Sequence, residues 1–166
     1  KPGDLDAHQN LLVDRLNALG EFAESHGVIV ALEHHVGNAV EMPDQVLSIM
    51  EQVECPAIRI NFDISHFNVM GVPIEESVQS IVPYTAHAHV KDESGRAPEH
   101  QYLVPGEGGF DYIRYLKAMQ ANGYDGVIST EISMMVQQRP NYNPLEVATR
   151  SYAVLSSAFT EAGIER

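Results

Sequence analysis

The chain has 166 residues, 44% of them hydrophobic, which is enough to bury the core of a single domain over residues 1–166. Its formal net charge of −13 repels nucleic-acid phosphates, and the sequence contains neither an apolar run of membrane-spanning length nor a signal-peptide pattern. The single cysteine, Cys55, excludes an internal disulfide and a cysteine-based zinc site, and it suits a reducing compartment. The composition therefore favours a cytoplasmic protein that binds neither nucleic acid nor membrane.

Helical and strand patterns alternate along the whole chain. Apolar residues at helical spacing predict a first helix over residues 8–26, and a continuous apolar run predicts a buried parallel strand over residues 28–32. The same patterns predict further helices over 43–53, 73–80, 110–120 and 144–159, and further strands over 58–62, 85–90 and 126–130. Residues 91–109, rich in glycine and proline, are expected to form a long loop. Strands that alternate with helices imply a parallel α/β sheet, either a small doubly wound domain or half of an eight-stranded barrel.

A side chain that can bind a metal ion stands at the end of each predicted strand. Glu33, Asp63 and Glu131 follow the first, second and fourth strands, and His89 lies near the end of the third. Because the carboxyl ends of parallel strands share one edge of a sheet, these four side chains are expected to converge. Three clustered carboxylates without a cation would repel one another and raise their pKa values. The oxygen-rich set therefore predicts one divalent ion, Mn²⁺ first, with Mg²⁺, Co²⁺ or Zn²⁺ as alternatives.

Each of these residues also has an ordinary structural interpretation. Glu33 can be a helix cap or a surface residue, Asp63 can open a turn or cap a helix, and His89 can be a hydrogen-bonded residue of the sheet. Glu131 can pair with Arg139 or Arg150. The coincidence of all four residues at strand ends favours the metal site.

The segments around these residues, taken in order, resemble the xylose isomerase-like TIM-barrel superfamily from about residue 8 onward. They are Ala31-Leu32-Glu33-His34-His35, Asn61-Phe62-Asp63-Ile64-Ser65-His66, His87-Ala88-His89-Val90-Lys91-Asp92, Pro105-Gly106-Glu107-Gly108, Gly123-Tyr124-Asp125-Gly126 and Thr130-Glu131. The resemblance implies a (β/α)₈ barrel of which this chain supplies strands five to eight, so that the missing half or a homo-oligomer is expected to complete it. It implies the metal ligands Glu33, Asp63, His89 and Glu131, and the candidate substrate contacts His66, Arg96, His35 and Glu107.

The resemblance further predicts proton transfer beside the carbonyl of a sugar or sugar phosphate, through a metal-stabilised enediolate. Glu33 and Glu131 would be the catalytic pair of an isomerase or epimerase, acting on opposite faces of the substrate. One alternative is elimination, as in inosose dehydratases or enzymes that cleave C-glycosides, with His34 or His35 as an additional base.

Two further alternatives are a non-catalytic binding module and a DNA-repair enzyme that resembles endonuclease IV. The repair enzymes need an Asp-x-His pair before the Gly-Glu-Gly segment. His100 and Tyr102 stand at those places in this sequence, which disfavours DNA repair.

Overall fold

Four parallel strands form the central sheet of the protein, whose computed structural model describes residues 1–165. They are β1 (Val30–Glu33), β2 (Ile58–Asp63), β3 (Thr85–Val90) and β6 (Ile128–Thr130), and they lie in the order β1-β2-β3-β6. Because the spatial order follows the chain order, every connection moves one place in the same direction. A doubly wound sheet reverses direction at a switch point, whereas a barrel does not, so this order is typical of part of a barrel.

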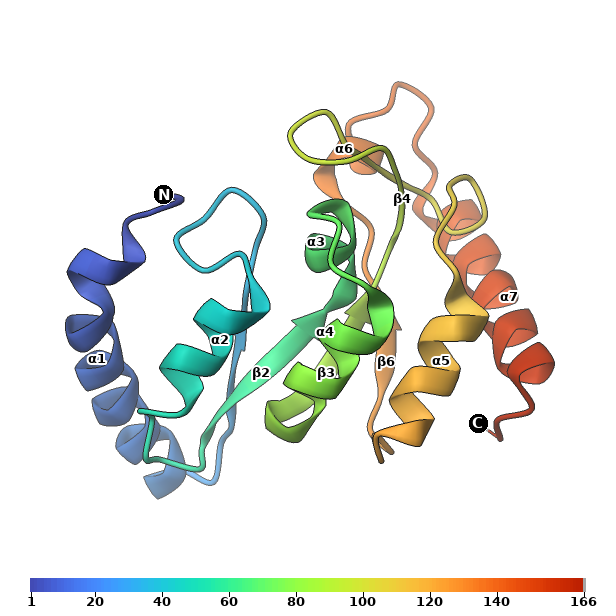
Figure 1. Ribbon diagram of the computed structural model, residues 1–166. Helices are drawn as coiled ribbons and strands as arrows, with labels where there is room; N and C mark the ends of the chain where they lie inside the picture. Colours follow the sequence, from blue (N-terminus) through green and yellow to red (C-terminus); the bar gives the residue numbers. More distant parts are fainter. Residues whose placement is uncertain (166) are drawn as a thin grey trace.

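The long helices cover one side of this sheet (Figure 1). They are α1 (Leu5–Ser25), α2 (Pro43–Met50), α4 (Ile74–Ile81), α5 (Tyr112–Ala121) and α7 (Pro144–Ala162). A 3₁₀ turn, η1 (Val82–Tyr84), leads from α4 into β3. Within the described part of the chain, none of the helices combines the length and the apolar character that crossing a membrane requires.

Shorter elements gather at the end of the sheet toward which the strands point (Figure 1). Helix α3 (Ile64–Val69) follows β2, and helix α6 (Met134–Gln137) follows β6. The strands β4 (Asp92–Ser94) and β5 (Gln101–Leu103) pair as an antiparallel hairpin after β3. The expected long loop over 91–109 is present only in part, because six of its residues form this hairpin.

All five predicted helices and all four predicted parallel strands are present, with shifted boundaries. The first strand begins two residues later than predicted, because the Val28 amide still closes the end of α1 by donating to Ala23 O. The first ladder bond is made by Val30 N, which donates to Ala57 O. The fourth strand likewise starts at Ile128 rather than at residue 126.

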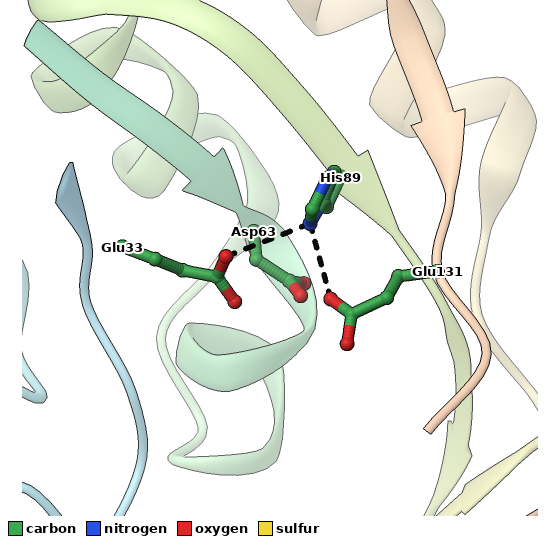
Figure 2. Close-up of side chains that lie close together, drawn as sticks. All are labelled: Glu33, Asp63, His89 and Glu131. Atoms are coloured by element: carbon green, nitrogen blue, oxygen red, sulfur yellow. Dashed lines mark hydrogen bonds and ion pairs between the residues drawn. The ribbon is translucent and has the colours of Figure 1, made fainter. Parts of the chain in front are cut away.

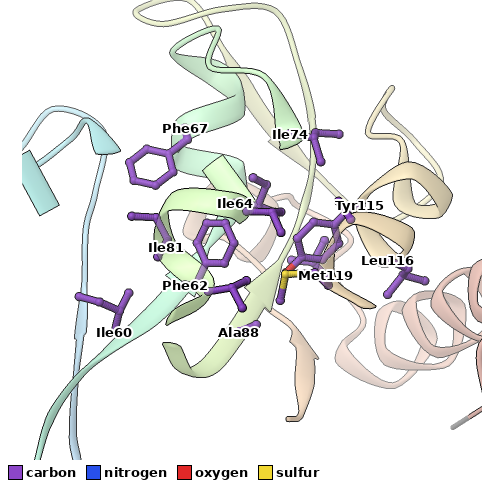
Figure 3. Close-up of a cluster of buried hydrophobic side chains, with 14 of the residues drawn as sticks. Ile60, Phe62, Ile64, Phe67, Ile74, Ile81, Ala88, Tyr115, Leu116 and Met119 are labelled. Atoms are coloured by element: carbon purple, nitrogen blue, oxygen red, sulfur yellow. The ribbon is translucent and has the colours of Figure 1, made fainter. Parts of the chain in front are cut away.

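Side-chain alternation along the strands gives the sheet two chemically different faces. Ile58, Ile60 and Phe62 of β2 are buried against the helices, together with Ala88 and Val90 of β3. Figure 3 shows Ile60, Phe62 and Ala88 among side chains of α3, α4 and α5, which are Phe67, Ile74, Ile81, Tyr115, Leu116 and Met119. The strand residues that alternate with these buried strand residues point to the opposite, helix-free face of the sheet. That face carries the candidate site.

Both edges of the sheet are open among residues 1–165, since β1 and β6 each pair with one neighbour. An apolar groove runs beside β6, between α5 and α7, and is lined by Val127, Ile128, Leu155 and Phe159 among others. Unpaired strand edges and apolar grooves of this kind are normally covered in a folded protein.

Candidate metal centre

The four side chains that end the parallel strands converge on one point (Figure 2). Glu33, Asp63, His89 and Glu131 each offer one ligand atom, and these atoms lie within 4.8 Å of one another. His89 Nδ1 is 3.0 Å from Glu131 Oε2 and 3.6 Å from Glu33 Oε2. The predicted convergence of these residues is thus present in the structure.

The sheet register explains why these four positions meet. Asp63 is the last residue of β2 and lies opposite His89 of β3, while Glu33 ends β1 opposite Asn61. Glu131 directly follows β6, and its amide extends the ladder by donating to Val90 O. All four therefore stand on the helix-free face at the carboxyl end of the sheet.

Asp63 caps a helix, as its structural interpretation predicted, and its two carboxylate oxygens have separate partners. Oδ1 accepts hydrogen bonds from Ser65 N at 3.0 Å and Ser65 Oγ at 2.6 Å, and so caps α3. Oδ2 faces the cluster, where it accepts a hydrogen bond from Lys91 and lies 3.6 Å from His66 Nε2. The helix cap fixes the carboxylate that the cluster uses.

Lys91 supplies a buried positive charge to the cluster. Its side chain is 3% exposed, and its ammonium group bonds Asp63 and lies 2.8 Å from Glu131 Oε2. Burial alone would raise the pKa of Asp63 and lower that of Lys91, but their pairing reverses both directions.

A hydrogen bond between His89 and Glu131 raises the pKa of the imidazole and lowers that of the carboxyl group. The expectation that clustered carboxylates would have raised pKa values is therefore wrong for Asp63 and Glu131. Lys91 and His89 provide the compensating positive charge at this site.

Two of the predicted substrate contacts lie beside the cluster. His66 is 1% exposed, and its Nε2 lies 3.7 Å from Glu33 Oε1. The ring of His35 packs on that of His66 with 4.0 Å between centroids, and its Nδ1 lies 2.6 Å from Val36 O. His34 points elsewhere: it is 3% exposed and stacks on Phe67 with 3.7 Å between centroids.

The other two predicted contacts have partners outside the cluster. Arg96 is exposed, and its one described hydrogen bond is to Gly95 O, at 3.4 Å. Glu107 forms ion pairs with Arg139 at 2.7 Å and Arg150 at 3.4 Å, which hold the pKa of its carboxyl group below the ordinary value. The structural alternative for Glu131 required an ion pair with one of these two arginines. Both arginines pair with Glu107 instead.

The loop that carries Glu107 is fixed by the carboxylate of Asp92, which is 1% exposed. Asp92 accepts hydrogen bonds from the amides of Gly106, Gly108 and Phe110 at 2.7, 3.0 and 3.1 Å. A Cβ atom at position 108 would lie 2.3 Å from Asp92 Oδ1, so the close approach requires glycine. Asp92 thus positions the segment that follows the hairpin.

Sequence reasoning missed three residues of the site. Asn61 Nδ2 donates to Glu33 Oε2 at 2.7 Å and lies 3.2 Å from His89 Nδ1. Asn61 stands two residues before Asp63 on the same face of β2, and Lys91 stands two residues after His89, just beyond the end of β3, so extending the alternation along the chain would have found both. Tyr102, whose hydroxyl lies 2.7 Å from His66 Nδ1, comes from the unforeseen hairpin, and the sequence indicated it only as the residue at the histidine position of the repair enzymes' Asp-x-His pair.

The donor set fits a divalent cation. Two ligand atoms bound to one ion at about 2.1–2.3 Å lie at most ~4.6 Å apart, so a spread of 4.8 Å needs only small side-chain movements. Carboxylate oxygens and one imidazole nitrogen suit Mn²⁺, Mg²⁺ or Zn²⁺. Glu33, Asp63, His89 and Glu131 would hold the ion, and Asn61 and Lys91 would contact its ligands.

Comparisons with known proteins agree with the motif resemblance. The sequence pattern of the family described as xylose isomerase-like TIM barrel matches residues 1–157. An inosose dehydratase of Salmonella agona is 29% identical over an aligned length of 165 positions, and the match covers 90% of this chain and 54% of that protein.

Two solved structures share the fold. A D-tagatose 3-epimerase-like protein is 27% identical with a TM-score of 0.73, over 93% of this chain and 55% of that one. The IOLI protein, crystallised with a bound zinc atom, is 26% identical with a TM-score of 0.77, over 93% and 57% of the two chains. The present chain spans about half the length of the curated relatives that it matches.

Proposed function

The chain belongs to the xylose isomerase-like TIM-barrel family, and from this premise we propose that it is the metal-binding part of a sugar isomerase or epimerase. The observation that carries the proposal is the convergence of three carboxylates and one imidazole at the carboxyl ends of four adjacent strands. Active sites of parallel α/β barrels lie at that end. The relatives named as a dehydratase and an epimerase-like protein support a small sugar-like substrate.

The cation of the proposed site is a divalent ion, with Mn²⁺ preferred. When bound, such an ion polarises the carbonyl group of a sugar and stabilises the negative charge that develops as a neighbouring proton leaves. Asp63 serves only to hold the ion, since its side chain is fully buried, and His89 is the other ligand without a proposed acid–base role.

Glu33 and Glu131 are the proposed acid–base pair, a role supported by their placement on opposite sides of Asp63 and His89 (Figure 2). Their side chains are the two more accessible ones of the cluster, 32% and 38% exposed. The Glu131 carboxylate is ionised at neutral pH, since its hydrogen bond to His89 holds its pKa below the ordinary value, and it can accept a proton from one face of the substrate. Glu33, which must carry a proton at the start of this step, gives that proton to the other face, and exchange with solvent restores the starting protonation states of both side chains.

A second candidate, elimination of water, is favoured by the inosose dehydratases among the relatives. It needs an additional base near the cluster. Burial lowers the pKa of His34 to about 3, and its stacking on Phe67 keeps it from the helix-free face, so His34 does not suit that role. His35 is exposed beside His66 and remains the candidate base.

Completion of the barrel is part of the proposal. The open edges of β1 and β6, with the apolar groove beside β6, suit pairing with four more strands, from a longer form of the polypeptide or from a second copy. The assignment of the four parallel strands to positions five to eight of the barrel belongs to this part of the proposal.

Proton exchange with solvent tests the proposed function. The Mn²⁺-loaded protein is incubated in D₂O with ketoses, ketose phosphates and inososes, and NMR follows deuterium incorporation and product identity. Deuterated epimers or isomers support the first candidate, and dehydrated products support the second. Glu33→Gln and Glu131→Gln should each abolish turnover, whereas Glu107→Gln should retain it. Turnover that persists in both of the first two variants would contradict the assignment of the acid–base pair.

A further inference from the structure

His66 lies in the wall of the candidate site with its two ring nitrogens facing opposite surroundings. Nε2 points toward Glu33 Oε1 and Asp63 Oδ2, at 3.7 and 3.6 Å. Nδ1 points away from the cluster and lies 2.7 Å from the hydroxyl oxygen of Tyr102. Within residues 1–165, no other group is within hydrogen-bonding distance of either nitrogen.

The orientation of this ring matters because the two edges of an imidazole differ. A half-turn about the Cβ–Cγ bond would exchange each nitrogen with a carbon and place C–H groups against the two carboxylates. Packing alone distinguishes these orientations poorly, since the exchanged atoms have similar size. The hydrogen bond between Nδ1 and Tyr102 selects one of them.

Tyr102 is itself held firmly enough to act as such an anchor. Its side chain is 5% exposed, and it stands opposite Glu93 in the β4–β5 hairpin. Its backbone amide donates to Met135 Sδ at 3.5 Å, and the Lys91 ammonium lies 5.3 Å from its ring centroid. The phenol therefore approaches His66 from a fixed direction.

We propose that Tyr102 is a positioning residue that acts through His66: its hydroxyl holds the ring with Nε2 toward Glu33 and Asp63. A nitrogen there supports the two carboxylates, because it places a polar atom 3.7 and 3.6 Å from their oxygens where the flipped ring would place a C–H group. The assignment of these carboxylates to a cation rests on the proposed function, but the orientation of the His66 ring does not. The hairpin thereby contributes to the site without offering a ligand of its own.

The direct test observes the His66 ring nitrogens by ¹⁵N NMR in the wild type, Tyr102→Phe and Tyr115→Phe. Loss of the signals in His66→Gln assigns them. Tyr115→Phe is the matched control, because it also removes a buried hydroxyl, one that has no hydrogen-bond partner among the described residues.

In the wild type, the ¹⁵N chemical shift of Nδ1 is expected to differ from that of a free imidazole nitrogen, because Nδ1 is hydrogen-bonded. This measurement needs no variant. The Nδ1 resonance should move in Tyr102→Phe and stay in Tyr115→Phe. A wild-type resonance at the position of a free imidazole nitrogen, or an unchanged one in Tyr102→Phe, overturns the proposal.

A thermodynamic cycle tests whether Tyr102 acts through His66. Partners of metal ligands typically change metal affinity by 10–100-fold when replaced, so Tyr102→Phe is expected to raise the Mn²⁺ dissociation constant about tenfold. In the His66→Gln background, Tyr102→Phe should not raise the Mn²⁺ dissociation constant further. If the double variant instead shows the product of the two single-variant increases, the proposal is overturned. A wild type that binds no Mn²⁺ but shows the expected ¹⁵N response refutes the proposed function and leaves the positioning role supported.

Discussion

Replacing Asp63 by asparagine removes one charge from the centre of the site and turns the oxygen that accepts from Lys91 into an amide donor. Asparagine has nearly the same shape and is as good a helix cap, so the hydrogen bonds from Ser65 to the capping oxygen can persist. The substitution therefore isolates the buried charge pair between Asp63 and Lys91.

The magnitude follows from what remains around Lys91. Removal of one partner from a buried ion pair costs about 3–5 kcal/mol when the other charge is left alone. Glu131 Oε2 stays 2.8 Å from the ammonium group but is partly exposed, so it compensates only in part. We expect the free energy of unfolding to fall by about 2–3 kcal/mol.

Urea denaturation followed by circular dichroism, in the presence of a chelator, measures this change. Asp111→Asn is the matched control, because Asp111 also caps a helix but is exposed and faces no buried lysine. Its stability should stay within about 0.5 kcal/mol of the wild type. The double variant Asp63→Asn/Lys91→Met should recover most of the loss, since it leaves no unpaired charge. Equal effects of Asp63→Asn and Asp111→Asn would refute the reasoning.

Two further predictions concern the hairpin and the loop after it. Burial raises the pKa of the Glu93 carboxyl group to about 8. Because the folded protein binds this proton more tightly than the unfolded chain, the protonated carboxyl group stabilises the folded state. This contribution is complete below the ordinary pKa of 4.5 and is lost as the pH rises toward 8. Stability of the wild type relative to Glu93→Gln should therefore fall by up to ~1.4 kcal/mol per pH unit in that window, measured by urea denaturation, and a constant difference would contradict this. Gly108→Ala should lower the free energy of unfolding by about 1–3 kcal/mol, because the added Cβ would lie 2.3 Å from Asp92 Oδ1. Gly109→Ala is the control and should be tolerated, because no atom lies within 4 Å of the added Cβ. Equal losses of stability in the two variants would contradict the close approach at Gly108.

The sequence predicted the alternating elements because each parallel strand is a short apolar run and each long helix has an apolar stripe. The four strand-end residues followed from topology, since parallel strands bring their carboxyl ends together whatever the connections do. Glu33 and Glu131 are almost a hundred residues apart in sequence, yet this rule sufficed to bring them together.

What the sequence did not predict depends on contacts between distant segments. The β4–β5 hairpin is three residues long on each side, too short for a clear pattern, and Asp92 fixes the loop that follows it through backbone amides. The sign of the pKa shifts was wrong because the position of the Lys91 ammonium depends on side-chain packing. Tyr102 reaches His66 only through the hairpin.

Mn²⁺ binding by the purified chain tests the central claim most directly. Isothermal titration of the wild type, Glu131→Gln and Glu107→Gln compares a cluster residue with a glutamate that pairs with arginines elsewhere. We predict one ion per chain, binding weakened at least tenfold by Glu131→Gln, and wild-type affinity in Glu107→Gln. Equal affinities in all three proteins, or no binding by the wild type, would contradict a metal centre at these strand ends.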